Sequence, residues 1–92
     1  MQSSDILVTH PVGLHARPAA EFVKTAGKFP CNITVCNLTT AGKTVNAKSI
    51  LSVLTLGVQQ GHTIRIETDG ENEVEAMAAL QELIASNFGE SA

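Results

Sequence analysis

Seven consecutive residues near the start of the chain, Gly13-Leu14-His15-Ala16-Arg17-Pro18-Ala19, constrain the fold most strongly. They join an apolar, strand-like run, Ile6-Leu7-Val8, to a helical pattern. The first N–H groups of a helix have no internal acceptor and lie at its partly positive end, so they bind anions such as phosphate. Ser, Thr, Asp and Asn commonly satisfy these groups, and none occurs in this run. The sequence therefore predicts a surface anion site that contains His15 and Arg17.

Two further segments accompany this run, Gly42-Lys43-Thr44-Val45-Asn46-Ala47-Lys48-Ser49-Ile50-Leu51 and Leu56-Gly57-Val58-Gln59-Gln60-Gly61. Together the three resemble the HPr family, the histidine phosphocarriers of the phosphoenolpyruvate-dependent sugar phosphotransferase system. Residues 13–19 are similar to its active-site signature and residues 42–51 to its regulatory-serine region. The resemblance covers nearly the whole chain, so we expect one phosphocarrier domain over residues 1–92.

The first helix has two possible starts. Proline prefers the first helical position, which would make Arg17 the cap residue. The family resemblance instead implies that the helix begins at Ala16, with His15 as its cap. Either start leaves free N–H donors beside His15.

The resemblance also implies the chemistry. His15 would accept a phosphoryl group on Nδ1, giving a pros-phosphohistidine, from the phosphoenolpyruvate-charged enzyme I. It would pass this group to sugar-specific IIA components. Arg17 would position the phosphoryl oxygens, and the backbone of Ala16 and Arg17 would bind them. Such a protein is a substrate of partner enzymes rather than an enzyme, and needs no cofactor or metal. We expect no such role for His10 or His62.

Ser49 supports two interpretations. At the start of a second helix it would serve as an ordinary cap. In some members of the resembled family this serine is phosphorylated by an ATP-dependent serine kinase/phosphorylase. That modification would regulate docking, including docking to a transcriptional regulator, through the added negative charge.

The helix after Ser49 is more apolar than one buried stripe requires, which predicts a docking patch for partner proteins. The alternative is that most of these residues belong to the core. Lysines on and near the first helix would border the patch and attract acidic partners. The predicted partner surface comprises Ile50, Leu51, Leu54, Lys24, Lys28 and Lys48.

The bulk properties exclude several other classes of protein. A net charge of −3 argues against nucleic-acid binding, and no apolar run is long enough for membrane insertion. The N-terminus has no signal-peptide pattern, so we expect a cytoplasmic protein, which we also expect to be monomeric.

Cys31 and Cys36 lie on one predicted strand, about 16 Å apart. Bonded cysteines have Cα atoms within about 7 Å, which excludes an internal disulfide.

The expected order of elements is strand, helix, strand, strand, helix, strand, helix. Strands are predicted at residues 6–9, 31–38, 43–45 and 61–68, and the second helix at residues 49–56. Either Asp69 or Asn72 would cap the final helix. Its buried stripe is predicted to be Val74, Met77, Leu80 and Ile84. A hairpin between the second and third strands favours an antiparallel or mixed sheet with helices on one face. The resemblance implies an α+β open-faced sandwich, with four antiparallel strands in the order 1-4-2-3 and three helices on one face.

Two other functions are possible. The first is a purely regulatory binding module that uses phosphorylated Ser49, although a binding module needs no nucleophile such as His15. The second is a histidine-dependent hydrolase, but the sequence offers no orienting acid or metal-binding set.

Overall fold

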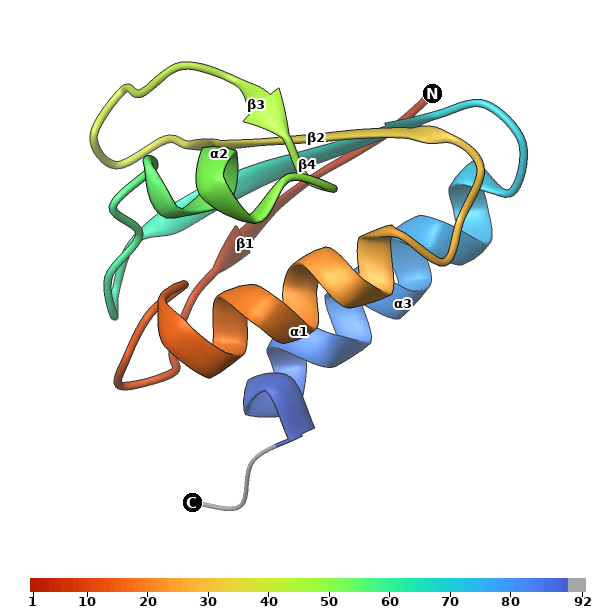
Figure 1. Ribbon diagram of the computed structural model, residues 1–92. Helices are drawn as coiled ribbons and strands as arrows, with labels where there is room; N and C mark the ends of the chain where they lie inside the picture. The colour runs from red at the N-terminus through yellow and green to blue at the C-terminus, as the bar shows by residue number, and fades with distance from the viewer. Residues whose placement is uncertain (90–92) are drawn as a thin grey trace.

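Two central strands, β2 (Asn32–Asn37) and β4 (Thr63–Asp69), form the middle of the sheet. In both strands alternate side chains are buried, among them Ile33 and Val35 of β2 and Ile64 and Ile66 of β4. Successive side chains of a strand point to opposite faces, so this alternation gives the sheet one apolar face and one polar face. The computed structural model, which describes residues 1–89, covers the apolar face with helices (Figure 1).

The predicted topology is confirmed. The other two strands are β1 (Gln2–Leu7) and β3 (Val45–Asn46); the four lie in the order β1-β4-β2-β3, and every neighbouring pair is antiparallel. The helices are α1 (Ala16–Ala26), α2 (Ile50–Leu54) and α3 (Glu73–Ala85), followed by the 3-10 turn η1 (Asn87–Gly89). Helices α1 and α3 lie side by side under the sheet, and α2 packs against α1 and β3 (Figure 1).

The observed strand ends differ from those predicted from apolar residues, because backbone pairing extends or shortens each strand. β1 begins four residues earlier than predicted, because Gln2 pairs with Thr68 and Ser4 with Ile66. The predicted strand at residues 43–45 is wrong at its start: only Val45 and Asn46 lie opposite β2. β2 is one residue shorter than predicted at each end, and β4 is shifted towards the C-terminus.

The first helix begins at Ala16, with His15 at the N-cap position. The alternative in which Arg17 caps the helix is wrong. Pro18 is buried against the core as the third helical residue, and Phe22 is fully buried on the same helix. α2 is shorter than predicted, and Ser49 is its N-cap.

The predicted buried stripe of α3 is wrong at Val74, which is 57% exposed. Met77, Leu80 and Ile84 are buried as predicted, and Ala76 joins them. Val74 lies about 100° round the helix from the centre of these residues. The first turn of α3 therefore directs Val74 away from the sheet, although its spacing from Met77 fits a helical stripe.

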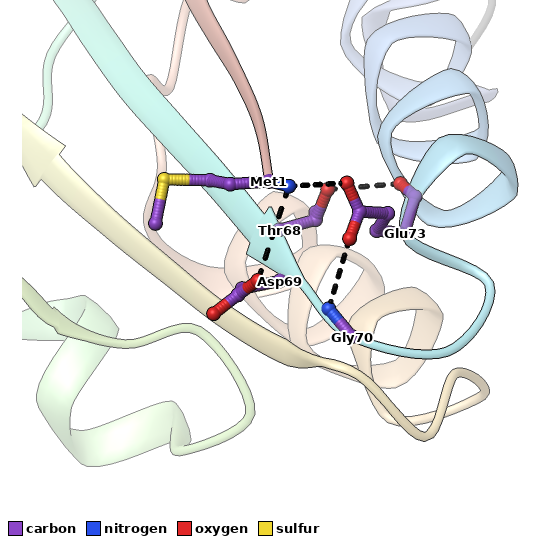
Figure 2. Close-up of polar contacts among 5 residues, drawn as sticks. All are labelled: Met1, Thr68, Asp69, Gly70 and Glu73. Atoms are coloured by element: carbon purple, nitrogen blue, oxygen red, sulfur yellow. Dashed lines mark hydrogen bonds and ion pairs between the residues drawn. The ribbon is translucent and has the colours of Figure 1, made fainter.

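The start of α3 is secured by Glu73 rather than by a capping side chain of Asn72. Asn72 occupies the N-cap position in a left-handed conformation, with φ of 64°, but makes no side-chain cap bond. Figure 2 shows the Glu73 carboxylate accepting the Gly70 N–H at 3.1 Å and lying 2.6 Å from the Met1 amine. The Thr68 hydroxyl donates to the Glu73 carbonyl at 2.8 Å. Hydrogen bonds from the Met1 amine and the Gly70 N–H hold the pKa of Glu73 below its usual range.

The open face of the sheet is polar. Asp5 of β1 and Arg65 of β4 are direct cross-strand partners, with the guanidinium donating to the carboxylate at 2.7 and 3.1 Å. This contact lowers the pKa of Asp5.

Cys36 lies on the open face of the sheet and Cys31 is buried, and both are free, as predicted. Within residues 1–89, no helix is long and apolar enough to span a bilayer.

The corrected stripe of α3 can be tested by a pair of truncations. We expect Leu80→Ala to lower the free energy of unfolding by about 2–5 kcal/mol, because it opens a cavity in the core. Val74→Ala removes an exposed side chain and should change it by less than about 0.5 kcal/mol. Urea unfolding of both variants measures the difference, and similar losses would contradict the assignment.

Candidate functional site

The connector between β1 and α1 is held against a second loop from the far side of the sequence. The Leu14 N–H donates to the Val58 carbonyl at 3.0 Å, and the Gly13 N–H donates to the His10 carbonyl at 2.9 Å. Gly13 has φ of 72°, and a Cβ placed there would lie 2.3 Å from the Val58 oxygen. Only glycine fits this close approach without a shift of one loop. The third segment of the resemblance, residues 56–61, thus lies directly against the first.

The start of the connector packs against the C-terminal turn. His10 is buried, its Nδ1 accepts the Val12 N–H at 3.0 Å, and its ring lies edge-on to Phe88 with centroids 5.8 Å apart. The Thr9 hydroxyl donates to the side-chain oxygen of Asn87 at 3.0 Å. His10 is therefore held within the connector by packing and hydrogen bonding.

His15 lies where the connector becomes a helix. Its backbone is extended, with φ of −128° and ψ of 166°, and its ring is half-buried. Within residues 1–89 the ring makes no hydrogen bond. The next residue, Ala16, has φ of 50°, a left-handed conformation that is uncommon for a residue with a side chain. The chain therefore turns sharply immediately after His15.

Two backbone donors follow His15 in the chain. No acceptor in the described part of the chain takes the N–H of Ala16 or of Arg17. Pro18 has no N–H, and the first helical bond runs from the Ala19 N–H to the His15 carbonyl at 3.4 Å. The Arg17 side chain is exposed and pairs with no carboxylate among residues 1–89. The structure thus places a ring nitrogen, two N–H donors and a guanidinium at one helix start, where they suit an oxyanion.

Ser49 is at the start of α2, where its Oγ accepts the Ser52 N–H at 3.4 Å. The structure therefore assigns it at least the predicted capping role.

In helix α2 Leu51 is 75% exposed, Ile50 38% and Leu54 37%, whereas Val53 is fully buried. The predicted patch is thus largely outside the core.

The three predicted lysines differ in their surroundings. Lys24 and Lys28 are exposed, on α1 and directly after it. The Lys48 ammonium donates to the Phe29 carbonyl at 2.7 Å, so it also joins the segment before α2 to the segment after α1. Among the residues from 1 to 89, no three His, Cys, Asp or Glu side chains form a group that could hold a metal ion.

The sequence analysis did not predict the hydrogen bond between Asn37 and His62. Asn37 is fully buried, and its amide lies 3.0 Å from Nδ1 of His62. The alternation of β2 does place Asn37 on the same buried face as Ile33 and Val35. A polar residue on a buried face needs hydrogen-bond partners. Its partners lie in other loops, however, and no local pattern identifies them.

A family model described as "PTS HPr component phosphorylation site" matches residues 2–86. This chain belongs to the HPr family. A phosphocarrier protein HPr of Xylella fastidiosa (strain 9a5c) is 47% identical over 90 residues, 98% of each chain. A multiphosphoryl transfer protein of Salmonella typhimurium is 40% identical over 98% of this chain but only 24% of its own length. The crystal structure of an HPr from Thermoanaerobacter tengcongensis covers 100% of both chains, with a TM-score of 0.93 and 46% identity.

Membership of the HPr family establishes the general function. The chain is a phosphocarrier of the phosphotransferase system, the system that couples phosphoryl transfer to sugar transport, and it is not an enzyme. HPr-like sequence also occurs within a larger multiphosphoryl transfer protein, as the Salmonella relative shows.

The close contact at Gly13 can be separated from its backbone conformation. Gly13→Ala would combine positive φ with a collision at the Val58 carbonyl. Gly57→Ala is a matched control, because Gly57 has φ of 60° and open space around its Cβ position. The left-handed conformation alone costs about 1–2 kcal/mol for alanine. We expect Gly13→Ala to lose clearly more unfolding free energy than Gly57→Ala and to shift the His15 resonances in NMR spectra; equal losses would contradict the contact.

Proposed function

We propose that His15 is the residue that carries the phosphoryl group. In this proposal His15 receives the group from phosphoenolpyruvate-charged enzyme I and delivers it to sugar-specific IIA components. The protein acts in the cytoplasm as a monomeric domain over residues 1–92. The observation that carries the proposal is the half-buried His15 ring, without a hydrogen bond within residues 1–89, beside the free N–H groups of Ala16 and Arg17.

The transfer step needs a neutral imidazole. The lone pair of Nδ1 attacks phosphorus, an N–P bond forms, and the bond from phosphorus to the donor breaks with its electron pair remaining on the donor. Nε2 keeps its proton. The N–P bond breaks readily when another nucleophile attacks phosphorus. The same arrangement of residues therefore serves both the acceptance and the delivery of the phosphoryl group.

The surrounding groups stabilise the charge on the moving phosphoryl group. In the loose transition state this charge spreads over three oxygens. The N–H groups of Ala16 and Arg17 and the partial positive charge of the helix start would bind these oxygens, and the exposed Arg17 guanidinium would contact them from outside.

Substitutions at His15 and Arg17 test these roles. We expect His15→Ala to accept no acid-labile phosphate from labelled phosphoenolpyruvate and enzyme I. Arg17→Ala should slow transfer by about 10- to 100-fold, the range for a lost charge-assisted hydrogen bond, with the fold intact. Arg65→Ala is the control, because Arg65 lies on the open face of the sheet. A normal rate in Arg17→Ala would remove Arg17 from the mechanism.

We also propose that Ser49 and the neighbouring apolar patch form the docking and regulatory surface. The patch is Ile50, Leu51 and Leu54, bordered by Lys24, Lys28 and Lys48. A phosphate on Ser49 would add roughly −1.5 to −2 charges beside these residues. Placed at the start of α2 it would favour the helix while changing which partners bind, including a transcriptional regulator.

Phosphorylation of Ser49 can be tested directly. We expect incubation with ATP and a serine kinase/phosphorylase to add one phosphate that mass spectrometry locates at residue 49. Ser49→Ala should abolish it, and Ser52→Ala, one helical turn away, should not. Loss of the cap in Ser49→Ala should also lower stability by about 1 kcal/mol. A stability loss without any phosphorylation of the native protein would leave Ser49 with the capping role alone.

A further inference from the structure

A buried polar network lies behind the loop that supports His15. Asn37, at the end of β2, is fully buried, and every polar contact of its side chain reaches a connecting segment. Its amide nitrogen donates to the Leu56 carbonyl at 3.3 Å and to Nδ1 of His62 at 3.0 Å. Its amide oxygen accepts the Thr39 N–H at 3.1 Å. A buried amide with all these partners is costly to leave unsatisfied, so it specifies the positions of its neighbours.

His62 is the outer member of this network. Its Nδ1 also lies 3.2 Å from the Gln59 N–H, which donates to it. Because Asn37 and Gln59 both present N–H donors, Nδ1 carries a lone pair and the ring proton is on Nε2. His62 therefore closes the turn at Gln59 twice, because its ring accepts the Gln59 N–H and its own N–H donates to the Gln59 carbonyl at 3.0 Å. The His62 carbonyl accepts the Val8 N–H at 2.9 Å.

The closed loop presents one carbonyl to the site. Val58 lies between Leu56, which Asn37 holds, and Gln59, which His62 holds. The Val58 oxygen accepts the Leu14 N–H, one residue before His15, and leaves room only for glycine at position 13. The contacts thus run without interruption from Asn37 and His62, through Val58, to the backbone that positions His15.

We propose that His62, held by Asn37, is a positioning residue for phosphoryl transfer at His15. With Nδ1 as the acceptor, His62 keeps the Val58 carbonyl in place, and the Val58 carbonyl keeps Leu14 and His15 at the helix start. This inference rests on the proposed role of His15 as phosphoryl acceptor. It concerns a side chain that does not touch the phosphoryl group and acts only through the loop.

Two substitutions at His62 test whether the hydrogen-bond acceptor at Nδ1, rather than the imidazole ring as such, positions the loop. His62→Leu removes the acceptor and leaves the Asn37 and Gln59 donors without it. His62→Asn retains an acceptor, because its side-chain oxygen can take the place of Nδ1. Thr68→Val is the matched control: it removes another buried side-chain hydrogen bond, to Glu73, at the opposite end of β4 from the site.

The experiment measures two quantities on the full chain of each variant. The first is the rate at which the protein accepts phosphate from labelled phosphoenolpyruvate and enzyme I. The second is the hydrogen-exchange rate of the Leu14 N–H, which reports directly on its bond to Val58. For His62→Leu we expect transfer to slow by about 3- to 10-fold, the factor that one hydrogen bond supplies, together with faster Leu14 exchange. His62→Asn should restore both quantities, and Thr68→Val should leave both close to the native values.

The outcomes distinguish this inference from the proposed function. If the native protein accepts phosphate and His62→Leu accepts it equally fast, the inference is wrong and the role of His15 stands. If His62→Asn is as slow as His62→Leu, or Thr68→Val is equally slow, positioning by the Nδ1 acceptor is wrong. If the native protein accepts no phosphate, the proposed function fails and this inference fails with it.

Discussion

The hydrogen bond from the Leu14 N–H to the Val58 carbonyl is the contact on which the arrangement of the site depends. It joins two loops from opposite parts of the chain at the residue before His15. The bond is possible only because Gly13 adopts positive φ and has no Cβ to strike the Val58 oxygen. Without it, the connector after β1 would keep its contacts with the C-terminal turn but lose its hydrogen bond to the Val58 carbonyl, so the entry into α1 at His15 would be less constrained.

The apolar layer between sheet and helices supplies the rigid frame for that contact. Phe22 of α1 belongs to the same buried apolar cluster as Ile64 and Ile66 of the sheet. Each such side chain contributes roughly 1.5–3 kcal/mol through burial, enough to hold α1 in one orientation. The free N–H groups of Ala16 and Arg17 owe their direction to this packing, because the start of a helix points wherever its apolar face has docked it.

The site also fits the requirements of a carrier. A carrier must be reached by a donor and by an acceptor in turn, so its reactive group belongs near the surface. His15 is half-buried and Arg17 exposed, while Leu14 and Val58, which join the two loops, are fully buried. The hydrogen bonds that join the loops run from Leu14 to Val58 and from Asn37 to Leu56 and His62. None of them uses the His15 ring or the Arg17 side chain, which stay available to partners.

From the amino-acid sequence alone we could predict the alternation of β2 and β4, the order of the elements and the presence of His15 and Arg17 at a helix start. These features are local: side-chain periodicity and capping preference are properties of short stretches. Together with the resemblance to the HPr family they were sufficient for the sheet order, and the chemical role of His15 stays a prediction. The packed fold, in contrast, directs Val74 away from the core, limits β3 to two residues and brings Gly13 against Val58. It also brings Asn37 and His62, 25 residues apart, within hydrogen-bond distance. The physical reason is that a buried polar group is satisfied by whichever partner the packed fold brings near, and that partner need not be close in the chain.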